Sequence, residues 1–180
     1  MRVVAGVYGG RRLLAPPGSE TRPTSDRVRE ALFSVLGPSL RDRHVLDLFA
    51  GSGALGIEAL SRGAAHAVFV DRSQQAIGAI RANLAALGIE AEVRPIAARA
   101  ALRAASARRE AYDLVFLDPP YRRAAELGRE LSEALPAVLA PGARVVTESD
   151  RRAPLDLDLP VADERRYGDT LIRIHDTHVS

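Results

Sequence analysis

The sequence predicts an α/β sandwich with a mainly parallel β-sheet between two layers of helices. The main observation is that, from residue 44 onward, short β-branched or apolar runs alternate with Ala- and Leu-rich stretches. That alternation is typical of βαβ units. A second observation is the glycine-rich segment 51–56 between a strand and a helix, where open α/β sheets bind ligands. The length of 180 residues is sufficient for one buried core.

The elements follow from this alternation and from the residues that interrupt it. Strands are expected near residues 44–49, 66–71, 90–96, 112–117 and 143–148. Helices are expected near residues 53–62, 73–87, 97–109 and 122–139. Gly63, Gly88 and the Pro141-Gly142 pair mark helix ends.

The chain after Pro154 shows a different pattern. Two β-prone runs, 155–166 and 170–175, follow one another across Tyr167-Gly168-Asp169, with no helix between them. Neighbouring strands without a crossover connection must be antiparallel. The sheet is therefore expected to end in an antiparallel hairpin.

Residues 1–43 precede the alternating pattern. Two short β-prone runs flank Gly9-Gly10, which predicts a hairpin with a two-residue turn. Thr24 and Ser25 are good N-cap types ahead of an apolar-periodic helix that Gly37-Pro38 should end. We interpret residues 1–43 as an extension of one domain formed by residues 44–180.

Composition excludes several classes of protein. Hydrophobic residues make up 47% and charged residues 27% of the chain, which is typical of a globular domain and not of a disordered one. Cysteine is absent, which excludes disulfides, thiolate nucleophiles and Cys-ligated metals. The histidines show no metal-ligand spacing, and no apolar run approaches the roughly 20 residues of a membrane span. A cytoplasmic, soluble monomer without metal is expected.

The glycine-rich segment follows the strand that ends at Asp47. Gly51, Gly53 and Gly56 match G-x-G-x-x-G, and Asp71 closes the next strand 20 positions after Gly51, where an acid would bind ribose hydroxyls. This pattern alone also fits a nicotinamide oxidoreductase, with Arg72 available for a 2′-phosphate. The acids could also simply cap helices, and the glycines could serve only close packing.

Asp47 favours a different ligand from a dinucleotide. A carboxylate so close to the glycines would repel a pyrophosphate, but it could orient an ammonium group. A cofactor that has no phosphate and has a cationic amino-acid end fits better, and S-adenosylmethionine is such a molecule.

A second constellation, Asp118-Pro119-Pro120-Tyr121, follows the predicted strand 112–117. It should lie beside the glycine-rich turn, because ligands bind beyond the carboxyl ends of parallel strands. The exocyclic amine of a base is a weak nucleophile that needs hydrogen-bond acceptors during methyl transfer. Asp118 and the Pro119 carbonyl can accept such bonds, and Tyr121 can stack on an extruded base. An ordinary Pro-rich loop is the alternative.

Arginine supplies every basic residue of the chain, and residues 1–43 hold eight arginines against four acids. The guanidinium group binds phosphate and stacks on bases, so an Arg-rich face suits nucleic acid. The candidates beside the expected active face are Arg22, Arg27, Arg122 and Arg123. Scattered, solvated arginines are the alternative.

Two long segments carry a resemblance to a known family. These are segment 22–33, RPTSDRVREALF, and segment 47–63, DLFAGSGALGIEALSRG. The Asp-Pro-Pro-Tyr motif follows them along the chain. Together they resemble the bacterial ribosomal RNA small subunit methyltransferase D family, within the class I S-adenosylmethionine-dependent methyltransferases. The resemblance implies a Rossmann-like fold with a seven-stranded sheet. It also implies methylation of guanine N2 in 16S rRNA of the assembling small ribosomal subunit.

The resemblance also implies roles for individual residues. The cofactor turn would comprise Asp47, Phe49, Ala50, Gly51 and Gly53, with Asp71 at the ribose and Arg72 as a further cofactor-binding residue. Thr24 would lie at the methionine end of the cofactor, and residues 118–121 would hold the target base. Many class I enzymes carry an acid near the adenine amine after the third strand, where this chain has Ala98, so apolar contact and backbone groups would hold the adenine. A non-catalytic RNA-binding assembly factor is the third hypothesis, and it has no evident need of Asp118.

Overall fold

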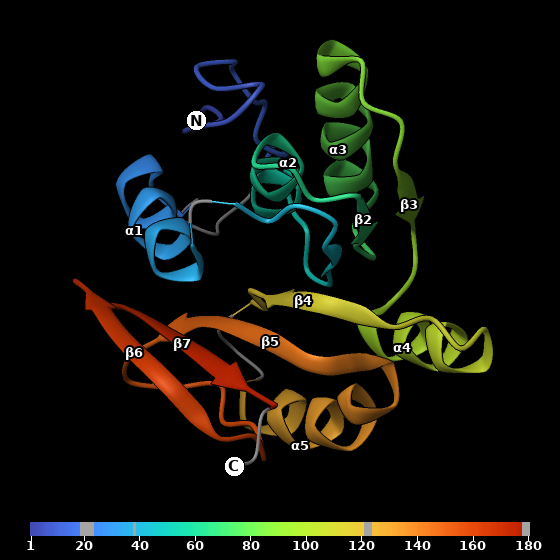
Figure 1. The fold of residues 1–180 in the computed structure, drawn as a ribbon, viewed down its shortest axis with the longest axis vertical. Coiled ribbons are helices and arrows are strands. Elements are labelled where there is room, and N and C mark those ends of the chain that lie inside the picture. The colour runs from blue at the N-terminus through green and yellow to red at the C-terminus, as the bar shows by residue number, and fades with distance from the viewer. Residues whose placement is uncertain (19–23, 38, 121–123, 178–180) are drawn as a thin grey trace.

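The computed structural model describes residues 1–18, 24–37, 39–120 and 124–177. At its centre lies a seven-stranded sheet in the order β3-β2-β1-β4-β5-β7-β6 (Figure 1). The strands are β1 (His44–Asp47), β2 (His66–Val70), β3 (Glu92–Arg94), β4 (Tyr112–Leu117), β5 (Leu139–Asp150), β6 (Val161–Tyr167) and β7 (Thr170–Asp176). Strands β1 to β5 pair in parallel, whereas β7 runs antiparallel to both β5 and β6. This confirms the predicted α/β fold and its closing antiparallel hairpin.

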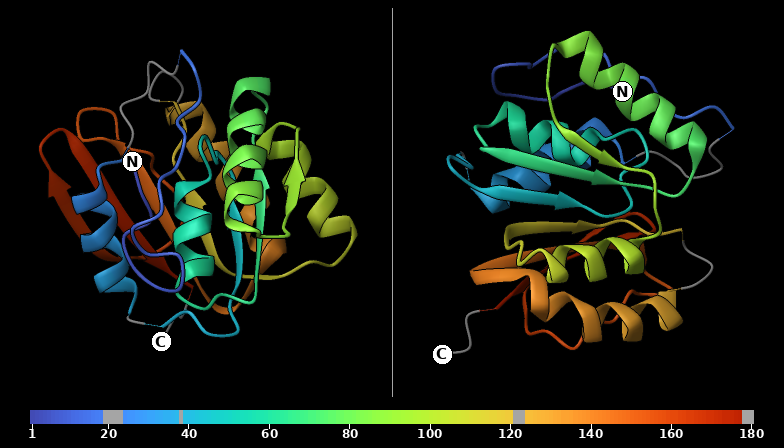
Figure 2. Two further views of the ribbon diagram at one scale, coloured as in Figure 1. Left: turned by 90° about the horizontal axis from the view of Figure 1, so that it is seen from above. Right: turned by 90° about the vertical axis from the view of Figure 1, so that its right-hand side faces the viewer.

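Helices cover both faces of the sheet, as the two turned views show (Figure 2). One face carries α1 (Asp26–Leu36), α2 (Ala54–Ser61) and α3 (Gln74–Leu87), and the other carries α4 (Ala98–Ala107) and α5 (Ala124–Ala134). Side chains alternate between the two faces along each strand. In β4, Phe116 therefore joins the core beneath α1 to α3, while Val115 joins the core above α4 and α5.

Several element boundaries differ from the prediction. The helix expected at 122–139 ends at Ala134 within the described residues and continues as a 3₁₀ helix, η2 (Leu135–Val138). Strand β5 then starts at Leu139, not at residue 143, because a shift of register opposite Tyr112–Leu114 accommodates Pro141 and Gly142. Strand β3 is shorter than expected, and β6 begins only at Val161.

The two N-terminal runs pair antiparallel as predicted, but the prediction of a two-residue turn between them is wrong. A single bridge joins Arg2 to Arg12, and the chain between them forms a broad loop. The reason is a competing acceptor. The backbone N–H groups of Val4 and Ala5 donate to the carboxylate of Glu58 at 2.8 and 3.0 Å instead of to a facing strand.

Side chains of α2 and α3 bind the N-terminal segment, residues 1–18, through Val4, Ala5 and Leu14. The Asn83 side chain accepts from Leu14 N at 2.8 Å and donates to the carbonyl oxygens of Leu14 and Ser52 at 2.9 Å each. Asn83 and Glu58 are both buried. The segment therefore lies against α2 and α3 (Figure 1) and is joined to the glycine-rich turn through Asn83.

Helix α1 begins and ends as its sequence predicts. The Ser25 hydroxyl accepts from Val28 N at 3.3 Å, which caps the first turn. The helix ends at Leu36, and the following residue, Gly37, adopts a φ of 108°, a conformation that favours glycine. Leu32, Phe33 and Leu36 are buried against the sheet.

Candidate active site

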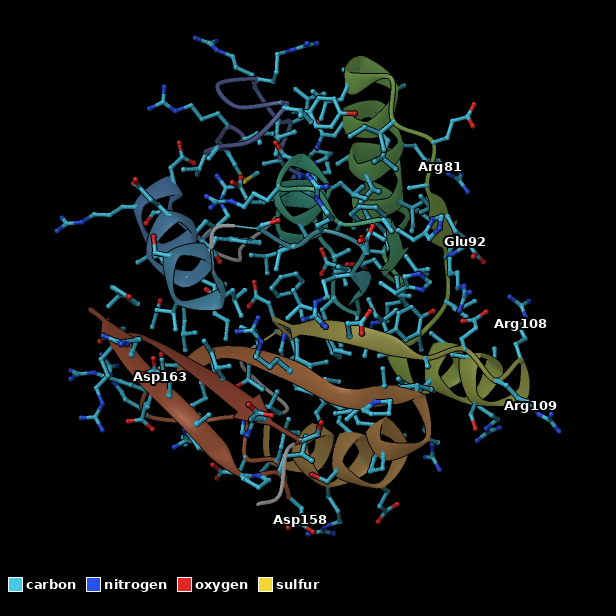
Figure 3. The ribbon with its side chains drawn as sticks, in the orientation of Figure 1. Arg81, Glu92, Arg108, Arg109, Asp158 and Asp163 are labelled. Carbon is cyan, nitrogen blue, oxygen red and sulfur yellow. The ribbon has the colours of Figure 1, made fainter. Side chains whose placement is uncertain are left out.

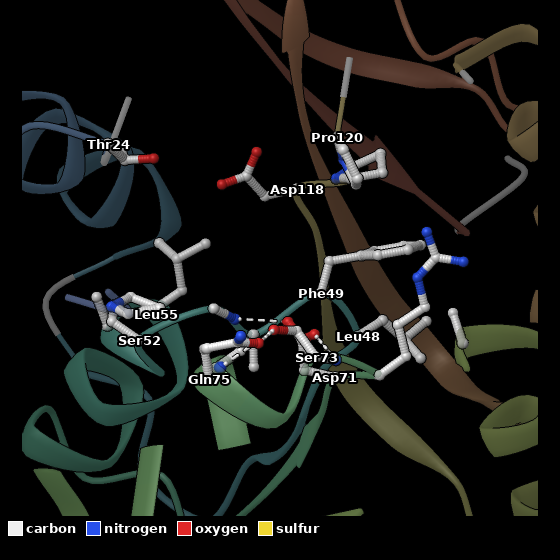
Figure 4. A pocket seen from close by; sticks show the side chains of 18 of the residues that line it. Thr24, Leu48, Phe49, Ser52, Leu55, Asp71, Ser73, Gln75, Asp118 and Pro120 are labelled. Carbon is white, nitrogen blue, oxygen red and sulfur yellow. Dashed lines mark hydrogen bonds between the residues drawn. The ribbon is translucent and has the colours of Figure 1, made fainter. Parts of the chain in front are cut away.

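A cavity of about 660 Å³ lies beyond the carboxyl ends of β1, β2 and β4 (Figure 4), within the size range of small-molecule sites. The glycine-rich turn, the end of β2 and the end of β4 contribute to its lining, as do the start of α4 and the N-terminal extension. Among the predicted residues, those that line it are Thr24, Phe49, Ala50, Gly51, Asp71, Arg72, Ala98, Asp118, Pro119 and Pro120.

The glycine-rich turn brings the chain from β1 into α2. Gly53, at the N-cap of α2, has a φ of 80°, and its N–H donates to Ala50 O at 2.7 Å. Gly56 allows close packing: a Cβ there would lie 2.4 Å from Cε1 of Phe69 on β2. The turn therefore needs glycine for its conformation at one position and for its packing at another.

Asp47 lies beneath this turn and does not line the cavity. Its side chain is 1% exposed, and its Oδ2 accepts from Gly56 N at 3.0 Å. The pKa of Asp47 is raised to about 7, mainly because the carboxyl group is buried; the Gly56 bond opposes the shift, and the nearby Asp71 carboxylate adds to it. In this structure Asp47 caps α2 and supports the turn from below.

Asp71 joins the end of β2 to the same turn. Its Oδ2 accepts from Gly51 N at 3.0 Å and its Oδ1 accepts from Ser73 N at 2.9 Å. Figure 4 draws both bonds and shows the carboxylate beside Gln75. Each oxygen retains a further lone pair, so the carboxylate can also accept from hydroxyl groups in the cavity.

Asp118 follows β4 on the opposite wall from Asp71 (Figure 4). Its carboxylate points toward the side chain of Thr24, and Pro119 and Pro120 stiffen the chain beyond it. Burial raises the pKa of Asp118, and the carboxylates of Glu148 and Asp47 raise it further. Tyr121, the last residue of this predicted motif, lies outside the described residues.

Sequence reasoning missed Glu148. It lies on β5 with 4% of its surface exposed, and its Oε2 accepts a short hydrogen bond from the Thr24 hydroxyl. Burial raises the pKa of Glu148, whereas the Thr24 bond and the positive charge of Arg29 act in the opposite direction. The apolar run that precedes it gave no sign of a functional acid.

Sequence reasoning also missed Arg29, which lines the cavity and is fully buried. Its Nη2 donates to Arg2 O and to Asp26 Oδ1, both at 2.5 Å. Its Nε and Nη1 have no hydrogen-bond partner among the residues described. Helical spacing could have found it, because residue 29 shares the buried face with Leu32, Phe33 and Leu36.

The remaining predicted residues lie elsewhere. Gly53 supports the turn from outside the cavity lining, and Arg27 is exposed on α1. Arg22, Arg122 and Arg123 fall outside the described residues. Figure 3 shows Arg108 and Arg109 pointing outward at the end of α4, as expected of a helix end on the surface.

No group of three or more His, Asp or Glu side chains that could hold a metal ion occurs among the residues that the structure describes. Nor does any helix among these residues have the length and apolar character needed to cross a membrane.

Comparison with known proteins supplies the family. Residues 1–176 match the family described as Conserved hypothetical protein 95. The chain is 40% identical to the Bacillus subtilis (strain 168) protein named "Putative rRNA methyltransferase YlbH", with 97% of this chain and 98% of that protein covered. It is 41% identical to Ribosomal RNA small subunit methyltransferase D of Escherichia coli (strain K12), over 68% of this chain and 61% of that protein.

A solved structure agrees with this result. The structure titled "Putative methyltransferase yhhF from Escherichia coli" superposes with a TM-score of 0.82 at 35% identity, and covers 100% of this chain and 99% of that one. The chain thus has the Rossmann-like fold of class I methyltransferases. It belongs to the Conserved hypothetical protein 95 family and is a homologue of ribosomal RNA small subunit methyltransferase D.

Proposed function

We propose that this protein transfers a methyl group from S-adenosylmethionine to N2 of one guanine in 16S rRNA, within the assembling small ribosomal subunit. The observation that carries the proposal is that Asp118-Pro119-Pro120 and the glycine-rich turn line the same cavity. Family membership adds rRNA methylation, because the relatives carry that name. It also favours a methyltransferase over the oxidoreductase and assembly-factor hypotheses.

The residues of the cavity fit S-adenosylmethionine. The Asp71 carboxylate has lone pairs left for ribose hydroxyls, and Phe49 and Leu48 offer apolar surface. Ala98, at the start of α4, would contact the adenine, and Thr24 would border the methionine end. When bound, the sulfonium of this group supplies an electrophilic methyl carbon.

Asp118 and the Pro119 carbonyl would hold the amino group of the target guanine. A hydrogen-bond acceptor beside the amino group favours the pyramidal nitrogen that develops as the bond to the methyl carbon forms. The two prolines hold that acceptor in place before the substrate binds. Tyr121 would stack on the extruded base, which must leave its helix to reach the cavity. Catalysis would then depend on positioning and electrostatics.

The RNA would approach over α1 and the loops beside it. Arg27 is exposed on α1, and Arg22, Arg122 and Arg123 flank the cavity residues in sequence. These side chains would neutralise phosphates and orient the substrate without reading its sequence. We propose that residues 1–43 extend the domain 44–180, and that the protein acts in the cytoplasm as a monomer.

The test is transfer of labelled methyl from S-adenosylmethionine to small ribosomal subunits that lack the modification, followed by nucleoside mass spectrometry. We expect a single N2-methylguanosine in 16S rRNA. Naked 16S rRNA serves as the comparison substrate. Label in another nucleoside would contradict the assignment of guanine as the target. Absence of label, with cofactor binding demonstrated separately, would contradict the assignment of the small subunit as the substrate.

A further inference from the structure

Asp118 and Glu148 lie side by side at the carboxyl edge of the sheet. Strands β4 and β5 pair in parallel, and Leu117 is in register with Thr147, so Asp118 and Glu148 are each one position beyond this pair. Residues in register on adjacent strands share a face of the sheet. Both acids therefore project toward the face that carries α1, where Phe116 and Val146 also lie.

The charged groups around this pair are few. Asp47 lies on the β1 side of Asp118 and adds a like charge. Arg29 faces Glu148 from α1; it is fully buried, and its Nε and Nη1 atoms lack hydrogen-bond partners in the described chain. Thr24 donates the one hydrogen bond that the Glu148 carboxyl group accepts within the described residues. One buried guanidinium, which also donates to Asp26 on α1, thus faces the three carboxyl groups of Asp47, Asp118 and Glu148, and this excess of acids disfavours full ionisation of all three.

We propose that Glu148, held by Thr24, is a positioning residue of the methyl transfer, and that it shares a single proton with Asp118 so that the pair presents one negative charge to the amino group of the target. This inference rests on the function proposed above. Two neighbouring carboxyl groups that share a proton titrate as one unit. The raised pKa values of both acids agree with this arrangement.

The pair would also take up the proton that the reaction releases. As the N–CH₃ bond forms, the S–CH₃ bond breaks and its electrons remain on sulfur, which becomes a neutral thioether. The methylated nitrogen then carries an excess proton, which passes to the singly charged pair and leaves it doubly protonated and neutral. After the product leaves, one proton returns to solvent, so charge and atoms balance.

The test is the pH profile of single-turnover methyl transfer to small subunits by the full-length protein. Replacing Glu148 with Gln keeps an acceptor for Thr24 but removes the like charge beside Asp118. We expect the acid limb of the profile to move to lower pH by about one unit. Binding of S-adenosylmethionine, measured by calorimetry, should stay within about twofold of the wild type.

Two further variants make the result specific. Glu148→Asp retains the charge, and its acid limb should stay close to that of the wild type even though the Thr24 contact is lost. Glu90→Gln, at an exposed position after α3, should change nothing. An unmoved acid limb in Glu148→Gln with an active wild type would overturn the inference. An inactive wild type that still binds the cofactor would instead overturn the proposed function.

Discussion

The site has two halves, each made of residues that line the cavity and residues directly beneath them, and the two halves hold their carboxyl groups in different ways. On the side of β1 and β2, Asp47 and Asp71 accept three backbone N–H bonds, from Gly56, Gly51 and Ser73. On the side of β4 and β5, the one hydrogen bond that the carboxyl groups of Asp118 and Glu148 accept within the described residues comes from the Thr24 side chain. The first half is tied to the backbone, and the second half is not.

This difference matches what each half has to do. A turn that binds a cofactor benefits from being fixed before binding, because less conformational entropy is then lost on association. Acids that accept an amino group and a proton must instead keep lone pairs and charge available. Substitutions in the two halves should therefore have separable effects.

The largest effect is expected at Asp118. In Asp118→Asn the amide can offer only one acceptor oxygen and carries no charge, so single-turnover transfer should fall by about 100-fold or more. The dissociation constant for S-adenosylmethionine should change by less than about threefold. Rapid-quench kinetics and calorimetry on one preparation test both statements. Loss of cofactor binding with transfer retained would reverse the roles assigned to the two halves.

The next effect tests the rigid half through stability. In Gly56→Ala the new methyl would meet the Phe69 ring at 2.4 Å, and we expect a loss of about 1–3 kcal/mol in the free energy of unfolding. Gly78→Ala is the matched control, because this exposed helical position has no atom within 4 Å of a Cβ. The control should gain up to about 1 kcal/mol. Urea unfolding measures both, and equal losses in the two would contradict the packing argument.

Asp47 should leave a signature in the pH dependence of stability. Its pKa rises from the ordinary 3.8 to about 7 on folding, so between these values the folded state holds a proton that the unfolded state has lost. Its contribution to stability therefore falls as pH rises through this window, and is constant above it. In Asp47→Asn, the free energy of unfolding should therefore decrease with rising pH less steeply, by about 1 kcal/mol per pH unit. Urea unfolding from pH 5 to 7 tests this, and parallel slopes would contradict it.

The smallest effect is expected outside both halves, at Arg27. Arg27→Ala should weaken binding to small subunits by a few-fold and lower the salt dependence of log Kd by about one charge. Cofactor affinity and stability should not change. Arg81→Ala, at an exposed position on α3 (Figure 3), is the control. An equal loss in the control would indicate that RNA attraction depends on net charge alone.

Local patterns in the sequence predicted the fold well. The alternation after residue 44 predicted the parallel strands, and the absence of a helical pattern after Pro154 predicted the antiparallel hairpin; the structure confirms both. The errors came from contacts between distant segments. Val4 and Ala5 lack a regular strand partner because Glu58, more than 50 positions away, binds their N–H groups.

The site was predictable only in part, for the same reason. Asp71 and Asp118 follow strands and stand in recognisable motifs, so their place at one edge of the sheet could be inferred. Glu148 has no motif around it, and only the register of β4 with β5 brings it beside Asp118. Arg29 was hidden by its residue type, since arginine is rarely found fully buried.

The hydrogen bonds between the N-terminal extension and α3 can form only after α3 has been synthesised. Leu14 is made early, but Asn83, which binds both of its backbone groups, follows 69 positions later. At about 5–20 residues per second, that interval lasts roughly 3 to 14 s. During this interval Leu14 has no Asn83 to bind. Val4 and Ala5 likewise have no acceptor until Glu58 has been made. One wall of the cavity is therefore translated first yet assembled late, after the turn that it must meet has already been made.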